Sequence, residues 1–161
     1  HSLTLKQVKQ FDCGSKKHPR FKDQELVPGT EIPTLDEFFD LVSKHPHGAK
    51  VRFNIEMKSE EHLPKYSPSP KKFASLLIES LRKHKVLDRT IIQSFDLRTL
   101  KEARALESNS IISALIEDRP KTTLVSIALT YKANIVSPNH EWLTEEDVRS
   151  LHTAGIQVAP W

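Results

Sequence analysis

The 161-residue chain has little cysteine and glycine, and it lacks long apolar runs. Its single cysteine, Cys13, can form no internal disulfide. With only four glycines, no glycine-rich strand-to-helix turn appears, so a Rossmann or P-loop phosphate cradle is not expected. No stretch approaches the roughly 18 apolar residues of a membrane span, and the N-terminus lacks the basic-then-apolar pattern of a signal peptide. We therefore expect neither a disulfide scaffold nor a membrane span.

Charge gives little indication of a macromolecular partner. The 24 basic residues are offset by 21 acidic ones, and no long basic stripe alternates with aromatics, so no nucleic-acid partner is predicted. One basic loop, Lys16 to Lys22, could attract an anionic headgroup or a membrane surface. We prefer to interpret it as a solvated loop. The eight histidines include no pair with the i, i+4 spacing of a helical zinc site, and most are expected at the surface.

Strand-like and helix-like segments alternate along the chain. Thr34 and Glu37 have the spacing of a capping box, Ser69 followed by Pro70 predicts another helix start, and Asp96 can cap the helix that follows it. Gly155 is placed to end the last helix in a left-handed conformation. The predicted strands are 51–58, 90–93, 111–116, 134–136 and 156–159, and the predicted helices follow Thr34 and cover 70–84, 97–106, 122–131 and 144–154.

Five strands with helices between them, the later strands about 22 residues apart, predict an α/β fold with a parallel sheet. An open doubly wound sheet and a (β/α)₈ barrel both fit this rhythm. The missing glycine-rich turn favours the barrel. A complete TIM-type barrel has eight strands and about 250 residues, so we expect residues 1–161 to form a single partial barrel domain that lacks the first strands.

The segment VRFNIEMKS at 51–59 carries the most informative chemistry. Read as a strand, it puts apolar and polar side chains on opposite faces, with Glu56 and Lys58 together at the polar end. A carboxylate beside an ammonium suits a hard cation and a phosphate oxygen, although a polar face that simply meets water explains the same pattern. Because a barrel places its site at the carboxyl ends of its strands, the other candidates are Gln93, Ser94, Phe95, Glu117, Ser137, Asn139, His140 and Trp161. Asp12 is a further candidate in an early loop.

Four separated motifs resemble the glycerophosphodiester phosphodiesterase family. They are FNIEMKS at 53–59, IIQSFDLRTL at 91–100, SPNHEWLTEEDVRSLHTAGIQVAPW at 137–161, and a variable loop leading to Ile-Pro-Thr-Leu within 12–39. The resemblance covers nearly the whole chain. It implies a TIM-type barrel that hydrolyses glycerophosphodiesters to sn-glycerol 3-phosphate and an alcohol, in phospholipid catabolism, with a small-molecule substrate.

The resemblance also implies roles for individual residues. Glu56 matches a carboxylate ligand of a divalent metal, Ca²⁺ or Mg²⁺, and Lys58 matches the lysine that contacts the phosphate. Trp161 matches the aromatic residue at the mouth of the last strand. Ser94 and Phe95 match a motif that shapes the site, and His140, after a strand, is a candidate to touch the substrate.

The family's early motifs, His-Arg-Gly, Glu-x-Asp and His-Asp, are absent from this sequence. His1 is followed by Ser2 instead of aspartate, so no catalytic histidine is assigned, and the acid-base histidines are expected upstream. We expect the 161 residues alone to be inactive. Two alternatives remain: a non-catalytic phosphate-binding barrel or fragment, and an unrelated barrel enzyme that acts on phosphorylated sugars.

Overall fold

The computed structural model describes residues 2–161, which divide into two compact units at the junction of Ala49 and Lys50. The first unit contains two helices, α1 (Leu5–Val8) and α2 (Leu35–Lys44), joined by a long irregular segment. Thr34 and Glu37 form the predicted capping box of α2. An ion pair between Lys9 and Glu37 connects the end of α1 to the start of α2.

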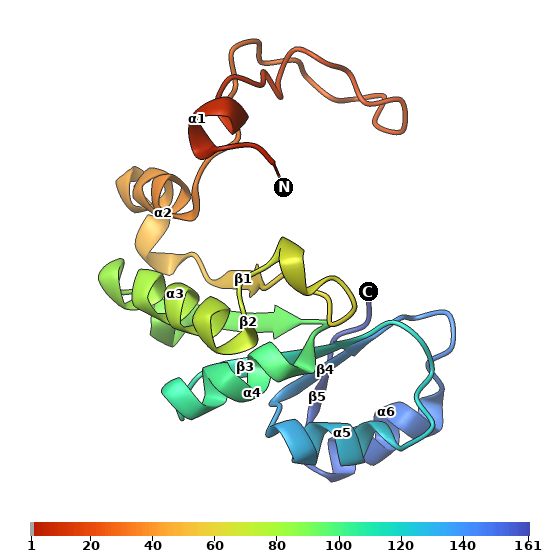
Figure 1. Cartoon of the computed structure of the whole chain (residues 1–161). Helices are drawn as coiled ribbons and strands as arrows, with labels where there is room; N and C mark the ends of the chain where they lie inside the picture. Colours follow the sequence, from red (N-terminus) through yellow and green to blue (C-terminus); the bar gives the residue numbers. More distant parts are fainter. Residues whose placement is uncertain (1) are drawn as a thin grey trace. The chain divides into compact units, whose positions relative to one another are not determined.

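The second unit is a parallel α/β structure (Figure 1). Its strands are β1 (Phe53–Glu56), β2 (Thr90–Ser94), β3 (Ile111–Ile116), β4 (Ile135–Pro138) and β5 (Gln157–Val158). The α-helices are α3 (Pro70–Lys83), α4 (Leu97–Leu106), α5 (Leu124–Tyr131) and α6 (Glu145–Thr153), and short 3₁₀ turns cover Pro64–Tyr66 and Leu87–Arg89. A further 3₁₀ turn, Gly48–Lys50, includes the last residues of the first unit and the first residue of the second.

The strand order distinguishes the two predicted architectures. The five strands pair in chain order, β1-β2-β3-β4-β5, and every pairing is parallel. A doubly wound sheet changes direction at a switch point, whereas a barrel adds each strand on the same side of the previous one. The observed order is that of a barrel segment, so the predicted partial (β/α)₈ barrel is confirmed over the sheet.

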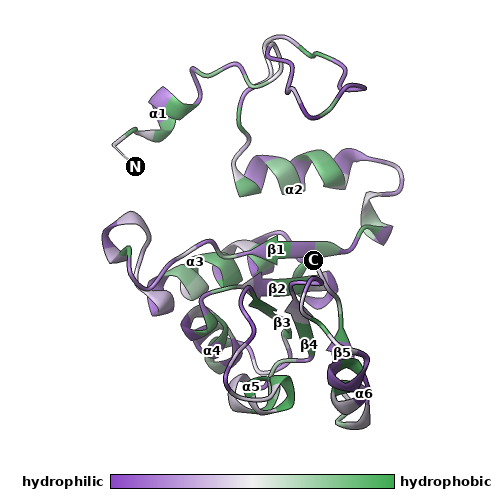
Figure 2. Cartoon of the chain, turned by 90° about the vertical axis from the view of Figure 1, so that its right-hand side faces the viewer, coloured by the Kyte–Doolittle hydropathy of each residue, from purple (hydrophilic) through white to green (hydrophobic). Residues whose placement is uncertain are grey.

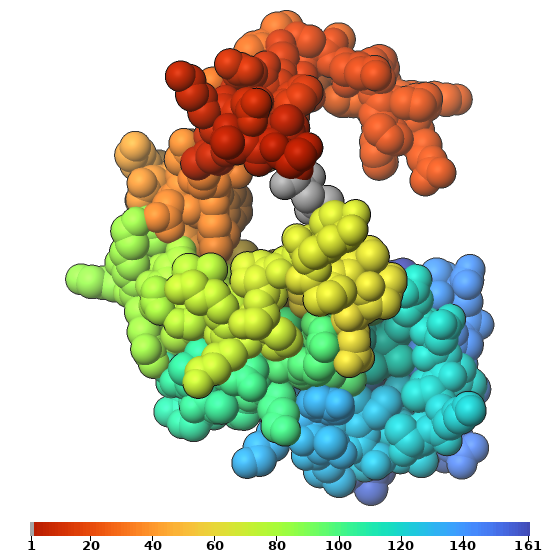
Figure 3. Space-filling model, viewed as in Figure 1, coloured from red at the N-terminus to blue at the C-terminus, as the bar shows by residue number. Residues whose placement is uncertain are grey.

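The core of this unit lies between the sheet and its helices. Ile92, Ile112 and Val136 point toward the helices from neighbouring strands and are fully buried, as are Leu100 of α4 and Leu151 of α6. Figure 2 shows β3 as mainly hydrophobic, and Figure 3 shows the segments from α3 to α6 as one continuous packed surface. Burial of these side chains stabilises the unit by roughly 1.5–3 kcal/mol for each large residue.

Most predicted element boundaries agree with the structure within two residues. The main difference is at the strand predicted for 51–58, which is regular only from Phe53 to Glu56. Beyond Glu56, the Met57 N–H still donates to the Gln93 carbonyl at 2.9 Å, whereas the Met57 carbonyl accepts from the Ser94 hydroxyl. Gly155 has φ +74°, the left-handed conformation predicted for the end of α6.

Across residues 2–161, no helix combines the length and apolar character that crossing a membrane requires.

Candidate active site

Glu56 and Lys58 lie at the carboxyl end of β1 and form an ion pair. The Lys58 Nζ donates to Glu56 Oε1 at 2.8 Å. The Glu56 side chain is 21% exposed, whereas the Lys58 side chain is 79% exposed. The carboxylate is therefore held partly within the fold, and the ammonium group is free to change partners in solvent.

A polar row continues from Glu56 across the neighbouring strands. In the register of the sheet, Glu56 pairs with Gln93 of β2, and Gln93 pairs with Ser113 of β3. Residues paired in this way point to the same face. Two residues before Glu56 on β1, the Asn54 side-chain amide donates to Gln93 Oε1 at 3.0 Å. The row places hydrogen-bonding groups on the face of the sheet opposite the helices.

Two serine hydroxyls are buried on this same face. Ser113 Oγ and Ser137 Oγ lie 2.7 Å apart and share one hydrogen bond, in which either hydroxyl can be the donor. Ser137 was a candidate site residue, and the structure places its hydroxyl in this pair.

Aromatic side chains from three strand ends come together. The rings of Phe95 and Trp161 meet edge to face, with centroids 5.4 Å apart and planes at 89°. The Trp161 carbonyl accepts from the His140 backbone N–H at 3.0 Å and lies 2.9 Å from His140 Nδ1. Phe95, His140 and Trp161 thus form one partly exposed cluster after β2, β4 and β5.

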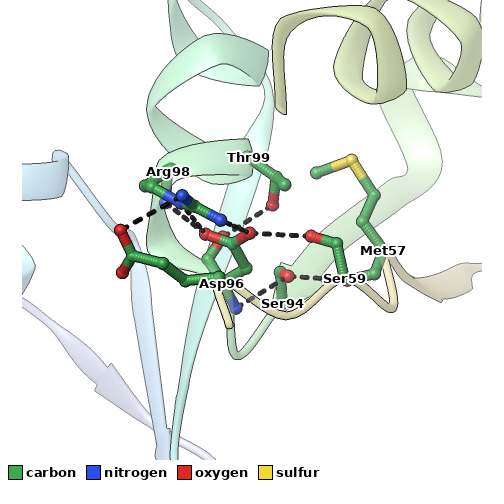
Figure 4. Close-up of polar contacts among 7 residues, drawn as sticks. Met57, Ser59, Ser94, Asp96, Arg98 and Thr99 are labelled. Atoms are coloured by element: carbon green, nitrogen blue, oxygen red, sulfur yellow. Dashed lines mark hydrogen bonds and ion pairs between the residues drawn. The ribbon is translucent and has the colours of Figure 1, made fainter. Parts of the chain in front are cut away.

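The fourth residue predicted to line the site, Ser94, is fully buried. Its hydroxyl donates to the Met57 carbonyl at 2.6 Å and accepts from the Asp96 N–H at 3.1 Å (Figure 4). Ser94 therefore contributes to the site by fixing backbone around it, and a direct contact with substrate stays a prediction.

Asp96 forms the densest group of polar contacts near the site. As the N-cap of α4 it accepts from the Arg98 N–H at 3.2 Å, and its two oxygens also accept from the Arg98 guanidinium at 2.9 and 2.8 Å. The Ser59 hydroxyl donates to Asp96 Oδ2 at 2.8 Å. The Arg98 guanidinium beside the carboxylate is the main cause that lowers the pKa of Asp96 below its usual value.

Three other candidates, Glu117, Asn139 and Asp12, have no hydrogen bond to these groups among the contacts described here. The Glu117 side chain is exposed, and its backbone carbonyl accepts from Trp142 Nε1. Asn139 Oδ1 accepts from the Glu141 N–H. Asp12 belongs to the first unit, where bonds from Ser15 and from the Gly29 N–H lower its pKa to about 2. Asp12 therefore stabilises its own loop.

A divalent metal needs several oxygen ligands, and the described residues do not supply them. Among residues 2–161, no group of three or more histidine, cysteine, aspartate or glutamate side chains is arranged to hold a metal ion. Glu56 offers one carboxylate, which is already paired with Lys58. The residues described here thus do not by themselves fit a metal centre. His1 lies outside the described residues.

Two features of the site were missed by sequence reasoning. The Asn54–Gln93 amide pair depends on the register of β1 and β2, which spacing along the chain does not give. Asp96 was predicted only as a helix cap, although Ser59, the residue directly after Lys58, is also bound to it. No local pattern in the sequence signals either contact, because the bonded residues are 39 and 37 positions apart.

Solved structures similar to this chain share its fold. A protein from Silicibacter pomeroyi DSS-3, provisionally assigned as a glycerophosphoryl diester phosphodiesterase, is 23% identical with a TM-score of 0.85, and the match covers 99% of this chain and 58% of that one. A protein from Galdieria sulphuraria with a similar provisional assignment is 26% identical, TM-score 0.77, over 99% of this chain and 56% of that one. An Oleispira antarctica phosphodiesterase, solved in complex with the product sn-glycerol-3-phosphate, is 21% identical, TM-score 0.73, over 98% and 57%.

This chain thus spans less than three fifths of the length of these three structures. No curated protein sequence matches it significantly. The model of the glycerophosphoryl diester phosphodiesterase family matches residues 1–161, the whole length of the sequence. This match shows that the chain belongs to the glycerophosphoryl diester phosphodiesterase family.

Proposed function

We propose that the full-length protein is a metal-dependent phosphodiesterase that hydrolyses glycerophosphodiesters to sn-glycerol 3-phosphate and an alcohol. The observation that carries the proposal is the Glu56–Lys58 pair at the carboxyl end of β1, the end at which barrel enzymes place their sites. Family membership and the sn-glycerol-3-phosphate bound to the Oleispira antarctica phosphodiesterase support this substrate class.

Lys58 is proposed to bind the phosphate. Its ammonium group carries three donors on a flexible stem, and a phosphodiester offers charged acceptor oxygens. In the structure the ammonium is neutralised by Glu56 at 2.8 Å and is largely exposed. An incoming phosphate can therefore replace Glu56 as the acceptor for the ammonium group, and little desolvation of Lys58 is required.

Glu56 is proposed as one ligand of the divalent metal that this family generally uses, with Ca²⁺ and Mg²⁺ as the candidate ions. Bound beside a phosphodiester, such an ion would offset the negative charge that builds up on the phosphoryl oxygens. A metal held here needs oxygen ligands beyond those of residues 2–161. For this reason, and because no acid-base histidine is assigned, we expect the 161 residues alone to be inactive.

The exposed aromatic cluster is proposed to line the substrate site. Phe95 and Trp161 present apolar ring surface, and His140 presents a ring nitrogen beside them. Ser94 is proposed to act indirectly, because its hydroxyl binds the Met57 carbonyl and so fixes the backbone that follows β1.

The test is turnover of glycerophosphocholine and glycerophosphoethanolamine by the full-length protein with Ca²⁺ or Mg²⁺, compared with Glu56→Gln. We expect the substitution to lower kcat/KM by about a hundredfold or more, because the amide is a poor ligand for a hard cation. Unchanged turnover would remove Glu56 from the mechanism.

Glu145→Gln is the matched control. Glu145 also pairs with a cation, Arg149, at 2.6 Å on an exposed surface, but it lies on α6 away from β1. This variant should retain full turnover. If the wild-type protein binds sn-glycerol 3-phosphate and hydrolyses neither substrate, the non-catalytic phosphate-binding alternative is correct. The family match already argues against an unrelated barrel enzyme acting on phosphorylated sugars.

A further inference from the structure

The segment from Met57 to Glu61 carries Lys58 and has no regular secondary structure. It is nevertheless anchored on both sides of Lys58. Before it, the Met57 side chain is buried and the Met57 carbonyl accepts from Ser94 Oγ at 2.6 Å. After it, the buried Ser59 donates its hydroxyl to Asp96 Oδ2 at 2.8 Å (Figure 4). Lys58 itself projects into solvent between two fixed neighbours.

Asp96 makes more contacts than a helix cap requires. The caps of α3, α5 and α6 are Ser69, Thr123 and Thr144, each of which caps its helix through a single hydroxyl. Asp96 instead has a carboxylate whose side chain is only 3% exposed and whose oxygens bind Ser59 as well as the start of α4. The second oxygen has no role in capping, so its partner indicates another use.

Arg98 connects Asp96 to the far end of the segment from Met57 to Glu61. Its guanidinium holds both Asp96 oxygens, and Nη1 reaches Glu61 Oε1 at 3.1 Å, at the far end of the Lys58 segment. A buried carboxylate without a cation would be costly, so Arg98 both neutralises Asp96 and forms a second link to the segment. Ser59 and Glu61 are therefore both tied to the first turn of α4.

We propose that Asp96 is a positioning residue: through Ser59, and with Arg98, it holds segment 57–61 against α4 and thereby fixes the backbone from which Lys58 reaches the phosphate. These contacts alone support the inference that the segment is held in place. The effect on phosphate binding rests in addition on the proposed function. Fixing a phosphate-binding group raises affinity because less freedom is lost on binding.

Hydrogen exchange of the full-length protein tests the hold directly. Ser59→Ala removes the link and leaves both the α4 cap and the Arg98 pair, so it should fold; Asp96→Asn weakens all three contacts. The amides of Met57 and Leu63 on either side of Lys58 donate to the Gln93 and Glu60 carbonyls at 2.9 and 3.1 Å. We expect these two amides to exchange about tenfold faster in both variants, with amides of β3 and β4 unchanged. Unchanged exchange at Met57 and Leu63 in Ser59→Ala would overturn the proposal.

Asp147→Asn is the matched control for a lost carboxylate at a helix start. Asp147 lies in the first turn of α6 and pairs with Arg119 at 3.2 Å, without touching segment 57–61. This variant should leave exchange at Met57 and Leu63 unaltered. Faster exchange there in this variant would mean that the segment responds to general destabilisation, which would also overturn the proposal.

A double-mutant cycle in the full-length protein tests whether the hold acts through Lys58. Ser59→Ala should raise KM for glycerophosphocholine by about tenfold with a smaller change in kcat, and it should have no further effect in a Lys58→Ala background. Equal effects in both backgrounds would show that Ser59 does not act through Lys58. If the wild type hydrolyses no glycerophosphodiester, the proposed function fails, and the same cycle is read from the Kd for sn-glycerol 3-phosphate.

Discussion

The two faces of the sheet in residues 50–161 carry different kinds of side chain, although they belong to the same strands. The face toward the helices carries Ile92, Ile112 and Val136, all fully buried. The opposite face carries Asn54, Glu56 and Gln93, whose polar groups bind one another or Lys58. Because neighbouring residues of a strand point to opposite faces, these apolar and polar side chains are separated. The second face also carries buried apolar surface, since Ile135 pairs with Ser113 there. Substitutions on the first face should therefore change unfolding, and substitutions of the polar residues on the second should change the site.

Leu100→Ala should have the largest effect on stability and would sharpen this comparison. Leu100 of α4 is fully buried, so its truncation leaves a cavity and should lower the free energy of unfolding by about 2–5 kcal/mol. Urea denaturation measures the change. Leu129→Ala on α5, where the side chain is 65% exposed, is the control and should cost far less. Equal costs at the two positions would contradict the core assigned here.

Acidification should remove the stabilisation that the ionised Asp96 carboxylate provides. The pKa of Asp96 is lowered in the folded protein, so its ionised form stabilises the fold fully above the unfolded value of about 3.8 and stops doing so as the pH falls through the folded pKa. Asp96→Asn should lower the free energy of unfolding by about 1 kcal/mol at pH 7, which is the usual effect of losing a charged helix cap. Unfolding measured from pH 7 to pH 2 should show this difference shrinking toward the acid end, and a constant difference would contradict the assignment.

Asn54→Ala should have the smallest effect on stability. Asn54 is exposed and its amide binds only Gln93 among the contacts described here, so the change should stay within about 0.5 kcal/mol. Thermal unfolding of this variant beside Leu100→Ala tests the separation of the two faces directly. A loss above about 2 kcal/mol would break the comparison, since it would make the polar face a determinant of folding.

Sequence reasoning predicted elements well and contacts between them less well. The helix 97–106 and the strand 111–116 have the predicted limits, because a cap at Asp96 and a short, mainly apolar run rich in isoleucine are local signals. The Ser59–Asp96 bond joins residues 37 positions apart, and no local pattern encodes such a distance. The order of the strands likewise needed coordinates, because the rhythm of the elements fitted both a barrel and a doubly wound sheet.

The contact between His140 and Trp161 has a consequence for proton chemistry. A carbonyl oxygen only accepts hydrogen bonds, so the ring nitrogen Nδ1, 2.9 Å from the Trp161 carbonyl, must be the donor. The uncharged imidazole is thereby restricted to one tautomer, in which Nε2 keeps its lone pair. Any hydroxyl group that reaches this ring next to the Phe95–Trp161 pair would meet an acceptor already oriented by the end of the last strand.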